Sequence, residues 1–252
     1  LPNGAVATGT DVTLVATETG GGAASAATLT IGGAVRTADE GTVRLRADRM
    51  DLNGATFDAT GAGNNLALLE IGPQTAGRAV SWGGTDGTNL FLDTGSRTAI
   101  AGADATTVRL GQTTVNATAV TAGDIAFGSN LTIAGTLALN GTGAISTAGG
   151  VLDVPTLVIR GATSNSGAAS IALSGANVID ALDARATGDV SVTSSAPTFS
   201  ILGASSGAGL VLAATAAAGV LDLGTGTVSA ATSADNSADA MLRFSLNSVG
   251  TR

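Results

Sequence analysis

The chain has 252 residues, enough for one large domain with a substantial buried core. It contains no His and no Cys, which excludes Ser–His–Asp and Cys–His catalysis, His or Cys metal sites and a disulfide framework. Its 11 basic residues, all Arg, are outnumbered by 19 acidic ones, and the net charge is −8. A nucleic-acid partner is therefore not expected, because binding phosphates needs a basic surface.

Short runs of alternating apolar residues recur along the whole chain, and most of them end in Gly or Ala-Gly. The clearer runs are Val12–Ala16, Thr28–Gly33, Thr42–Ala47, Leu66–Gly72, Asn89–Gly95, Thr107–Gly111, Asn130–Gly135, Thr136–Gly141, Thr156–Gly161, Ser170–Gly175, Asp189–Ser194, Thr198–Gly203, Gly209–Ala214 and Val220–Gly224. Alternation over four to six residues predicts a strand with one buried face, and the terminal Gly permits a tight turn. Only the tail, Ala234–Phe244, suggests a short helix, with Ser237 as its N-cap.

The runs recur at a nearly constant distance. The spacings are 18 residues from Leu90 to Val108, 21 from Leu110 to Leu131, 20 from Leu137 to Leu157, 19 from Ile171 to Val190 and 20 from Val190 to Leu210. A period near 20 without intervening helices predicts an all-β solenoid of about 12 coils, in which each strand pairs in parallel with the next coil. We expect Leu137 to stack on Leu157, or Leu139 on Ile159, inside this solenoid.

An antiparallel sandwich or barrel is the competing fold, because it also consists of many short strands. Its hairpins would show Asn-Gly or Asp-Gly between strands, and only Asn140-Gly141 directly follows a strong run. We treat residues 1–252 as one domain, with the strongest repeats over 66–232 and a short helix or partial cap over 234–252. The longest charge-free stretch, Val190 to Leu221, is broken by Pro197, so no membrane-spanning helix is predicted.

Three segments, Ile71–Gly84, Thr106–Gly128 and Leu131–Gly161, carry a resemblance to a known family. In the order and spacing of their short sequence motifs they resemble the repeat region of filamentous-haemagglutinin-type, two-partner-secreted exoproteins of Gram-negative bacteria. The resemblance covers roughly Leu66 to Thr232. It implies a right-handed parallel β-helix in a large secreted or surface-held adhesin. The family's NPNL and NPNGI secretion sequences are absent, so this segment resembles shaft rather than secretion domain. Because the chain starts at Leu1 without a signal-like segment, we expect a processed or excised piece.

Two groups of polar residues are candidates for a metal-dependent or a glycosylation site. Asp180, Asp183 and Asp189, with Arg185 between them, form the densest carboxylate group, which a solvated turn explains better than a Ca²⁺-dependent lyase site. Three Asn-x-Thr triplets, at Asn116, Asn130 and Asn140, fit the acceptor pattern for N-glycosylation, but chance produces as many in a chain this rich in Ser and Thr. Trp82 and Phe91 mark either an exposed patch or a wide corner of the core.

The sequence therefore predicts no catalytic, cofactor-binding or metal-binding residue, and no enzyme. The favoured function is a structural β-helix shaft of a secreted or surface-attached bacterial adhesin, giving reach and display for cell adhesion or biofilm cohesion. The alternatives are a self-assembling extracellular filament or matrix subunit and a carbohydrate-binding or polysaccharide-cleaving β-helix. Expected partners are host-cell or bacterial surface glycans or proteins, or a second copy end to end. The receptor, the organism, the length of the parent protein and glycosylation at Asn116, Asn130 and Asn140 stay open.

Overall fold

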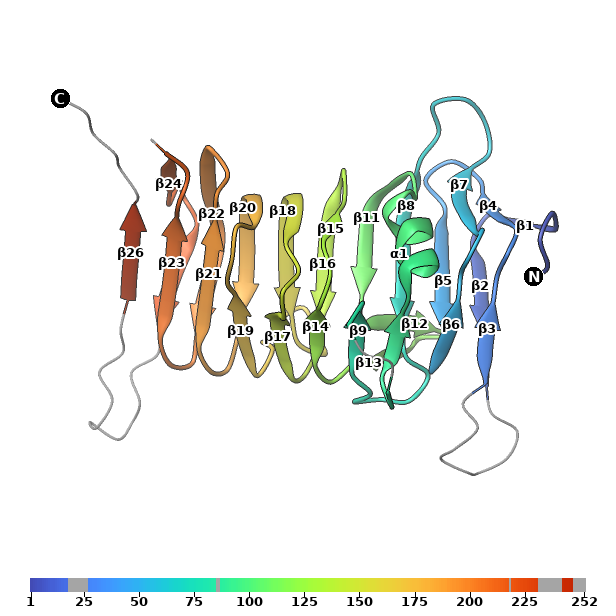
Figure 1. Ribbon diagram of the computed structural model, residues 1–252, viewed down its shortest axis with the longest axis horizontal. Coiled ribbons are helices and arrows are strands. Elements are labelled where there is room, and N and C mark those ends of the chain that lie inside the picture. The colour runs from blue at the N-terminus through green and yellow to red at the C-terminus, as the bar shows by residue number, and fades with distance from the viewer. Residues whose placement is uncertain (18–26, 85–86, 218, 231–241, 247–252) are drawn as a thin grey trace.

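The computed structural model describes residues 1–17, 27–84, 87–217, 219–230 and 242–246. This part of the chain consists almost entirely of β-strands, and all pairings except one are parallel. The strands lie side by side along the long axis of the molecule, from β1 at one end to β26 at the other (Figure 1).

Two long parallel sheets contain most of the strands. In spatial order, the longest consists of β2 (Val12–Val15), β5 (Thr42–Arg46), β8 (Leu66–Gly72), β11 (Ala105–Leu110), β16 (Thr136–Asn140), β18 (Leu152–Arg160), β20 (Val178–Arg185), β22 (Thr198–Ser206) and β24 (Val220–Asp222), with β15 (Leu131–Thr132) on β18 and β25 (Thr227–Ala230) on β22. The second consists of β10 (Leu90–Leu92), β9 (Val80–Trp82), β14 (Ile125–Phe127), β17 (Ala144–Thr147), β19 (Ser170–Leu173), β21 (Val190–Ser194), β23 (Leu210–Ala214) and β26 (Leu242–Leu246). From β16 to β23 the chain alternates strictly between these two sheets.

Three smaller sheets complete the described fold. They are the parallel sheet β1 (Val6–Gly9), β4 (Ala34–Thr37) and β7 (Thr56–Ala59), the parallel pair β3 (Thr28–Thr30) and β6 (Arg49–Asp51), and the antiparallel hairpin β12 (Gln112–Val115) and β13 (Thr118–Thr121). The all-β prediction with parallel pairing is confirmed.

The register of β16 on β18 agrees with the sequence pattern. Leu137 pairs with Leu157 and Leu139 with Ile159, and all four side chains are fully buried. The two pairs are therefore not the alternatives that the sequence predicts: both stack inward, because residues two apart in a strand share one face. A slip of one residue would turn this whole apolar set toward solvent, which is why the register is strongly specified.

The nearly constant period is wrong for the N-terminal half. There, paired residues of the long sheet are 31, 26, 39 and 29 residues apart along the ladder Val12, Val43, Leu69, Val108 and Leu137. Leu90 pairs with Val80 rather than lying one coil before Val108, and Leu110 pairs with Ile71 and Leu139 rather than leading to Leu131. Within the described residues, the path of the long sheet consequently has nine strands, where a uniform 20-residue period predicts about 12 coils.

Part of the extra length is a helix that the strand pattern did not predict. The alternating pattern predicts one strand over Asn89–Gly95, but the strand β10 ends at Leu92 and α1 (Thr94–Ala101) begins within the predicted range. Asp93 is the N-cap, and its Oδ1 accepts a hydrogen bond from the N–H of Ser96 at 2.8 Å. At eight residues, α1 is too short to show a sustained helical period.

The hairpin β12–β13 accounts for more of the extra length. Asn116 and Ala117 form its two-residue turn with φ of 48° and 61°, the positive values that a type I′ turn requires. The turn contains neither Asn-Gly nor Asp-Gly, the dipeptides that indicate a two-residue hairpin in the sequence, so the hairpin is not predicted. In the tail, Leu242–Leu246 is a strand rather than the expected helix, and residues 234–241 lie outside the described part.

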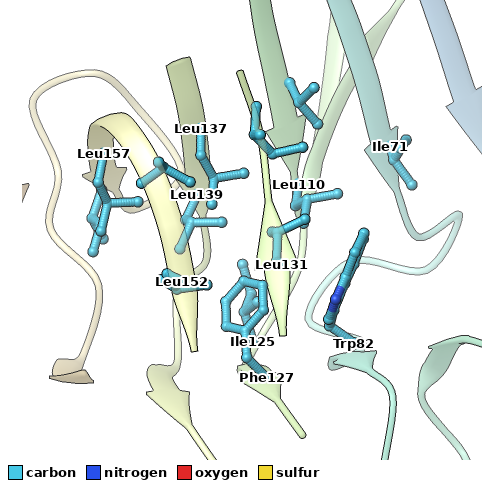
Figure 2. Close-up of a cluster of buried hydrophobic side chains, with 14 of the residues drawn as sticks. Ile71, Trp82, Leu110, Ile125, Phe127, Leu131, Leu137, Leu139, Leu152 and Leu157 are labelled. Carbon is cyan, nitrogen blue, oxygen red and sulfur yellow. The ribbon is translucent and has the colours of Figure 1, made fainter. Parts of the chain in front are cut away.

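Large apolar side chains from both long sheets meet between them (Figure 2). Trp82 belongs to this core: its side chain is buried, its ring lies 6.4 Å from that of Phe127, and its Nε1–H donates to the carbonyl of Asn130 at 3.1 Å. Phe91 is half-buried in β10. The tryptophan therefore fills the core rather than an exposed patch.

Replacing a stacked leucine should show how strongly the buried face depends on this packing. Leu157→Asp places a carboxylate without a partner in the apolar interior, so we expect a loss of several kcal/mol or no cooperative unfolding at all. Thr156→Asp, one position along the same strand and half-buried, is the control and should change the stability by about 1 kcal/mol or less. Urea unfolding followed by circular dichroism measures both. Equal midpoints would contradict the inward stacking.

Candidate functional site

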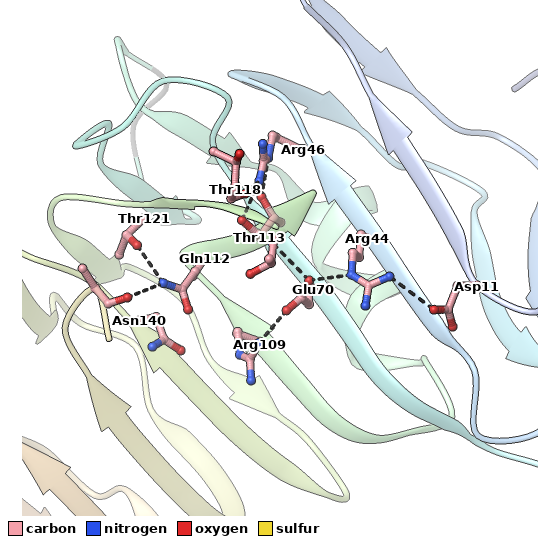
Figure 3. Close-up of polar contacts among 12 residues, drawn as sticks. Asp11, Arg44, Arg46, Glu70, Arg109, Gln112, Thr113, Thr118, Thr121 and Asn140 are labelled. Carbon is pink, nitrogen blue, oxygen red and sulfur yellow. Dashed lines mark hydrogen bonds and ion pairs between the residues drawn. The ribbon is translucent and has the colours of Figure 1, made fainter. Parts of the chain in front are cut away.

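The most deeply buried charged side chain of the described residues, that of Glu70, lies in a ladder of charges on the outer side of the long sheet (Figure 3). Glu70 on β8 pairs in register with Arg44 on β5 and with Arg109 on β11. Its Oε2 lies 3.1 Å from Arg44 Nε and its Oε1 lies 2.5 Å from an Arg109 terminal nitrogen. Asp11 extends the ladder, 3.5 Å from Arg44. The signs alternate along the ladder, so each rung attracts its neighbours.

The hairpin β12–β13 covers this ladder. The N–H of Thr114 donates to Glu70 Oε2 at 3.3 Å, which leaves Glu70 only 2% exposed. Arg46 lies beside it and donates from Nε to Thr113 Oγ1 at 2.7 Å and from one terminal nitrogen to the carbonyls of Thr113 and Thr118 at 2.6 and 2.8 Å. Burial lowers the pKa of Arg46 and the Glu70 carboxylate opposes that shift, so the guanidinium keeps its charge.

This arrangement is that of a structural cluster. Both oxygens of Glu70 are already engaged by donors, so neither faces a cavity as a general base would. The guanidinium of Arg46 donates its hydrogen bonds to two carbonyls and a hydroxyl of the hairpin. The ladder therefore fixes β5, β8, β11 and the hairpin together.

Neutralising the buried acid should therefore cost far more than neutralising an exposed one. Glu70→Gln keeps the shape of the side chain but leaves two arginines facing each other without their counter-ion, so we expect a loss of about 3 kcal/mol. Asp58→Asn is the control, because its ion pair with Arg36, at 3.0 Å, is exposed at both ends. That loss should be about 1 kcal/mol or less. Urea midpoints give both values, and similar losses would remove the ladder's special role.

A second recurring feature lies where strands begin. Asp11, Asp124 and Asp189 each precede a strand. Each Oδ1 accepts from the N–H at the equivalent position of the neighbouring parallel strand, on Thr42, Ala144 and Gly209, at 2.8, 2.7 and 2.8 Å respectively. Asn130 does the same for Val151 at 3.0 Å. These side chains pair backbone donors at the corners of successive turns, where the strand ladder has not yet begun.

A pair of variants at Asp124 tests this corner contact. Asp124→Ala removes the acceptor and should cost about 1 kcal/mol, whereas Asp124→Asn keeps a carbonyl oxygen in place and should recover most of that loss. Thermal unfolding distinguishes the two. If Ala and Asn variants melt together, the contact contributes nothing measurable.

The structure separates the four residues of the predicted carboxylate group. Asp180, Asp183 and Arg185 lie on β20, whereas Asp189 lies just before β21 in the other sheet and accepts from Gly209. Asp183 is held by an ion pair with Arg160, and Asp180 is exposed. In the described part of the chain, no three acidic residues gather as a metal site would require.

The three Asn-x-Thr asparagines lie in different surroundings. Asn116 is exposed at the hairpin turn, Asn130 accepts from Val151, and Asn140 is buried and donates from Nδ2 to the carbonyl of Gly161 at 3.2 Å. Asn116 is therefore the one of the three whose side-chain amide makes no hydrogen bond with the described residues.

Two surface hollows were not predicted from the sequence. One, of about 800 Å³, lies between the β6–β7 segment and α1 and is lined by Phe57 and Asp104 among others. The other, of about 430 Å³, lies over β20, β22 and β25 and includes Asp183 and Arg185. Both hollows depend on which strands and helix lie next to each other in space, and no run of consecutive residues predicts either of them.

No family model, curated protein or solved structure matches this chain. Of the helices in the described residues, none has the length and apolar character needed to cross a membrane.

Proposed function

We propose that this chain is a closed, right-handed parallel β-helix that serves as the non-enzymatic shaft of a secreted or surface-attached bacterial exoprotein. The observation that carries the proposal is the strict alternation of strands between the two long sheets from β16 to β23, with in-register pairing one turn later. A chain that alternates in this way winds around a shared core and grows along one axis.

The use of charged and polar groups supports a load-carrying role. Glu70, Arg44, Arg109 and Arg46 are engaged between neighbouring strands, and the corner carboxylates join successive turns. Such contacts resist shear between coils, which a shaft that holds a binding region away from a surface needs. The resemblance to filamentous-haemagglutinin-type exoproteins supports the same role in adhesion or biofilm cohesion, outside the cell or on its surface.

Removing one complete turn tests whether the chain is a modular rod. Deleting residues 139–158 joins Ala138 to Ile159, which takes the place of its partner Leu139 and keeps the alternation. We expect this variant to fold and to be shorter by one strand spacing, about 4.8 Å, at unchanged cross-section. Small-angle X-ray scattering measures length and cross-section, and circular dichroism measures folding.

Deleting residues 139–157 is the matched control. Because this deletion removes one residue less, it places Val158 on the buried face and Ile159 on the outer face. This variant should be strongly destabilised. Equal stability of the two deletions, or a change in cross-section in the first, would contradict the β-helix. Concentration-dependent filaments of the intact chain in electron micrographs would instead favour the matrix-subunit function.

A further inference from the structure

The hollow over β20, β22 and β25 consists of two aligned rows of side chains. Asp183 pairs in register with Gly203, which pairs with Thr227. Two residues further along the same strands, Arg185 pairs with Ser205, which pairs with Ser229. Both rows lie on the outer side of the sheet and run across three strands, each about 4.8 Å from the next.

A β-bulge shapes one wall of this groove. The register shifts between Leu182 and Asp183, because Leu182 pairs with Ile201 and Asp183 with Gly203. Leu202 is the extra residue, and it projects outward with 55% of its surface exposed. Gly203 forms a low point beside it, since a Cβ there would lie only 3.0 Å from Asp183 Oδ1. The groove of about 430 Å³ thus has an apolar wall and a polar floor.

Most polar side chains of the groove are not used by the fold. Within the described residues, the side chains of Arg185, Ser205, Thr227 and Ser229 make no hydrogen bond or ion pair. Asp183, by contrast, is neutralised by Arg160 from the neighbouring strand. A guanidinium and three hydroxyls without intramolecular partners therefore line one hollow, against an exposed leucine.

We propose that this groove binds a saccharide that carries a carboxylate. The Arg185 guanidinium offers paired donors that match a carboxylate, the hydroxyls of Ser205, Thr227 and Ser229 match those of a sugar, and Leu202 covers its apolar C–H face. Among its described residues, the groove offers one unpaired cation, Arg185, next to the Asp183 carboxylate. This charge distribution suits a ligand with a single negative charge better than a phosphate dianion or a densely sulfated chain. The row direction places successive sugar units along the shaft.

This inference goes beyond the shaft function. Saccharide binding depends only on the pairing of β20, β22 and β25, so a failure of the coil-deletion test would not contradict it. Equally, a failure to bind a saccharide would not contradict the proposed shaft.

A galacturonic acid tetramer is the probe, and its methyl ester is the matched ligand, which keeps the sugar backbone but removes the charge. Amide chemical-shift changes in the intact chain locate binding and give the Kd. We expect the acid to shift amides of β20, β22 and β25 and the ester to bind at least tenfold more weakly. Arg185→Gln should raise the Kd for the acid by tenfold or more. The melting temperature should not change, because the Arg185 side chain has no partner in the described fold.

Arg49→Gln removes the same charge from an exposed position on β6 and is the control, expected to bind like the unaltered chain. Heparin tetramer and inorganic phosphate test the other sources of negative charge and should bind more weakly than the acid. Four results would each overturn the proposal: no shifts at millimolar acid, shifts outside the groove, equal binding of acid and ester, or equal binding by Arg185→Gln.

Discussion

Parallel pairing one turn apart is the constraint on which the rest of this structure depends. Apart from the neighbouring pair β9 and β10, the strands of the long sheets take their hydrogen-bond partners from a different turn of the chain, so these strands depend on their neighbours for stability. Because side chains alternate between the two faces, this pairing also decides which residues are buried. The stacking of Leu137 on Leu157 and of Leu139 on Ile159 is its direct consequence.

The two halves of the chain meet this constraint differently. From β16 onward the turns are short, and the sequence pattern itself nearly repeats, so apolar alternation suffices to select the register. Between β5, β8 and β11 the separations are 26 and 39 residues. The helix α1 lies between β8 and β11, and the hairpin β12–β13 lies between β11 and β16. The charge ladder of Arg44, Glu70 and Arg109 lies in that irregular region. This ladder penalises a slip of β8 by one residue, because the slip would turn Glu70 toward the apolar core without a counter-ion.

The strands and the parallel class of the fold could be predicted from the sequence because both are encoded by local alternation and terminal glycines. The coil lengths could not, since they depend on α1, whose eight residues show no helical period, and on a turn formed by Asn116 and Ala117 instead of Asn-Gly. The partners of Glu70 escaped prediction for a different reason. Arg44 and Arg109 are 26 and 39 residues away, and only the register brings them together.

The division between inward and outward residues also allows this parallel β-fold to carry a groove. The inward residues are fixed by packing, whereas outward residues need only tolerate their neighbours, so rows such as Arg185, Ser205 and Ser229 are open to selection for binding. The bulge at Leu202 costs little inside, because Leu182 and Ala184 stay buried on either side of the shift. Outside, it changes a flat row of side chains into a walled hollow. A stack of parallel strands therefore gains a surface hollow by inserting one residue in one strand, without changing its packed core.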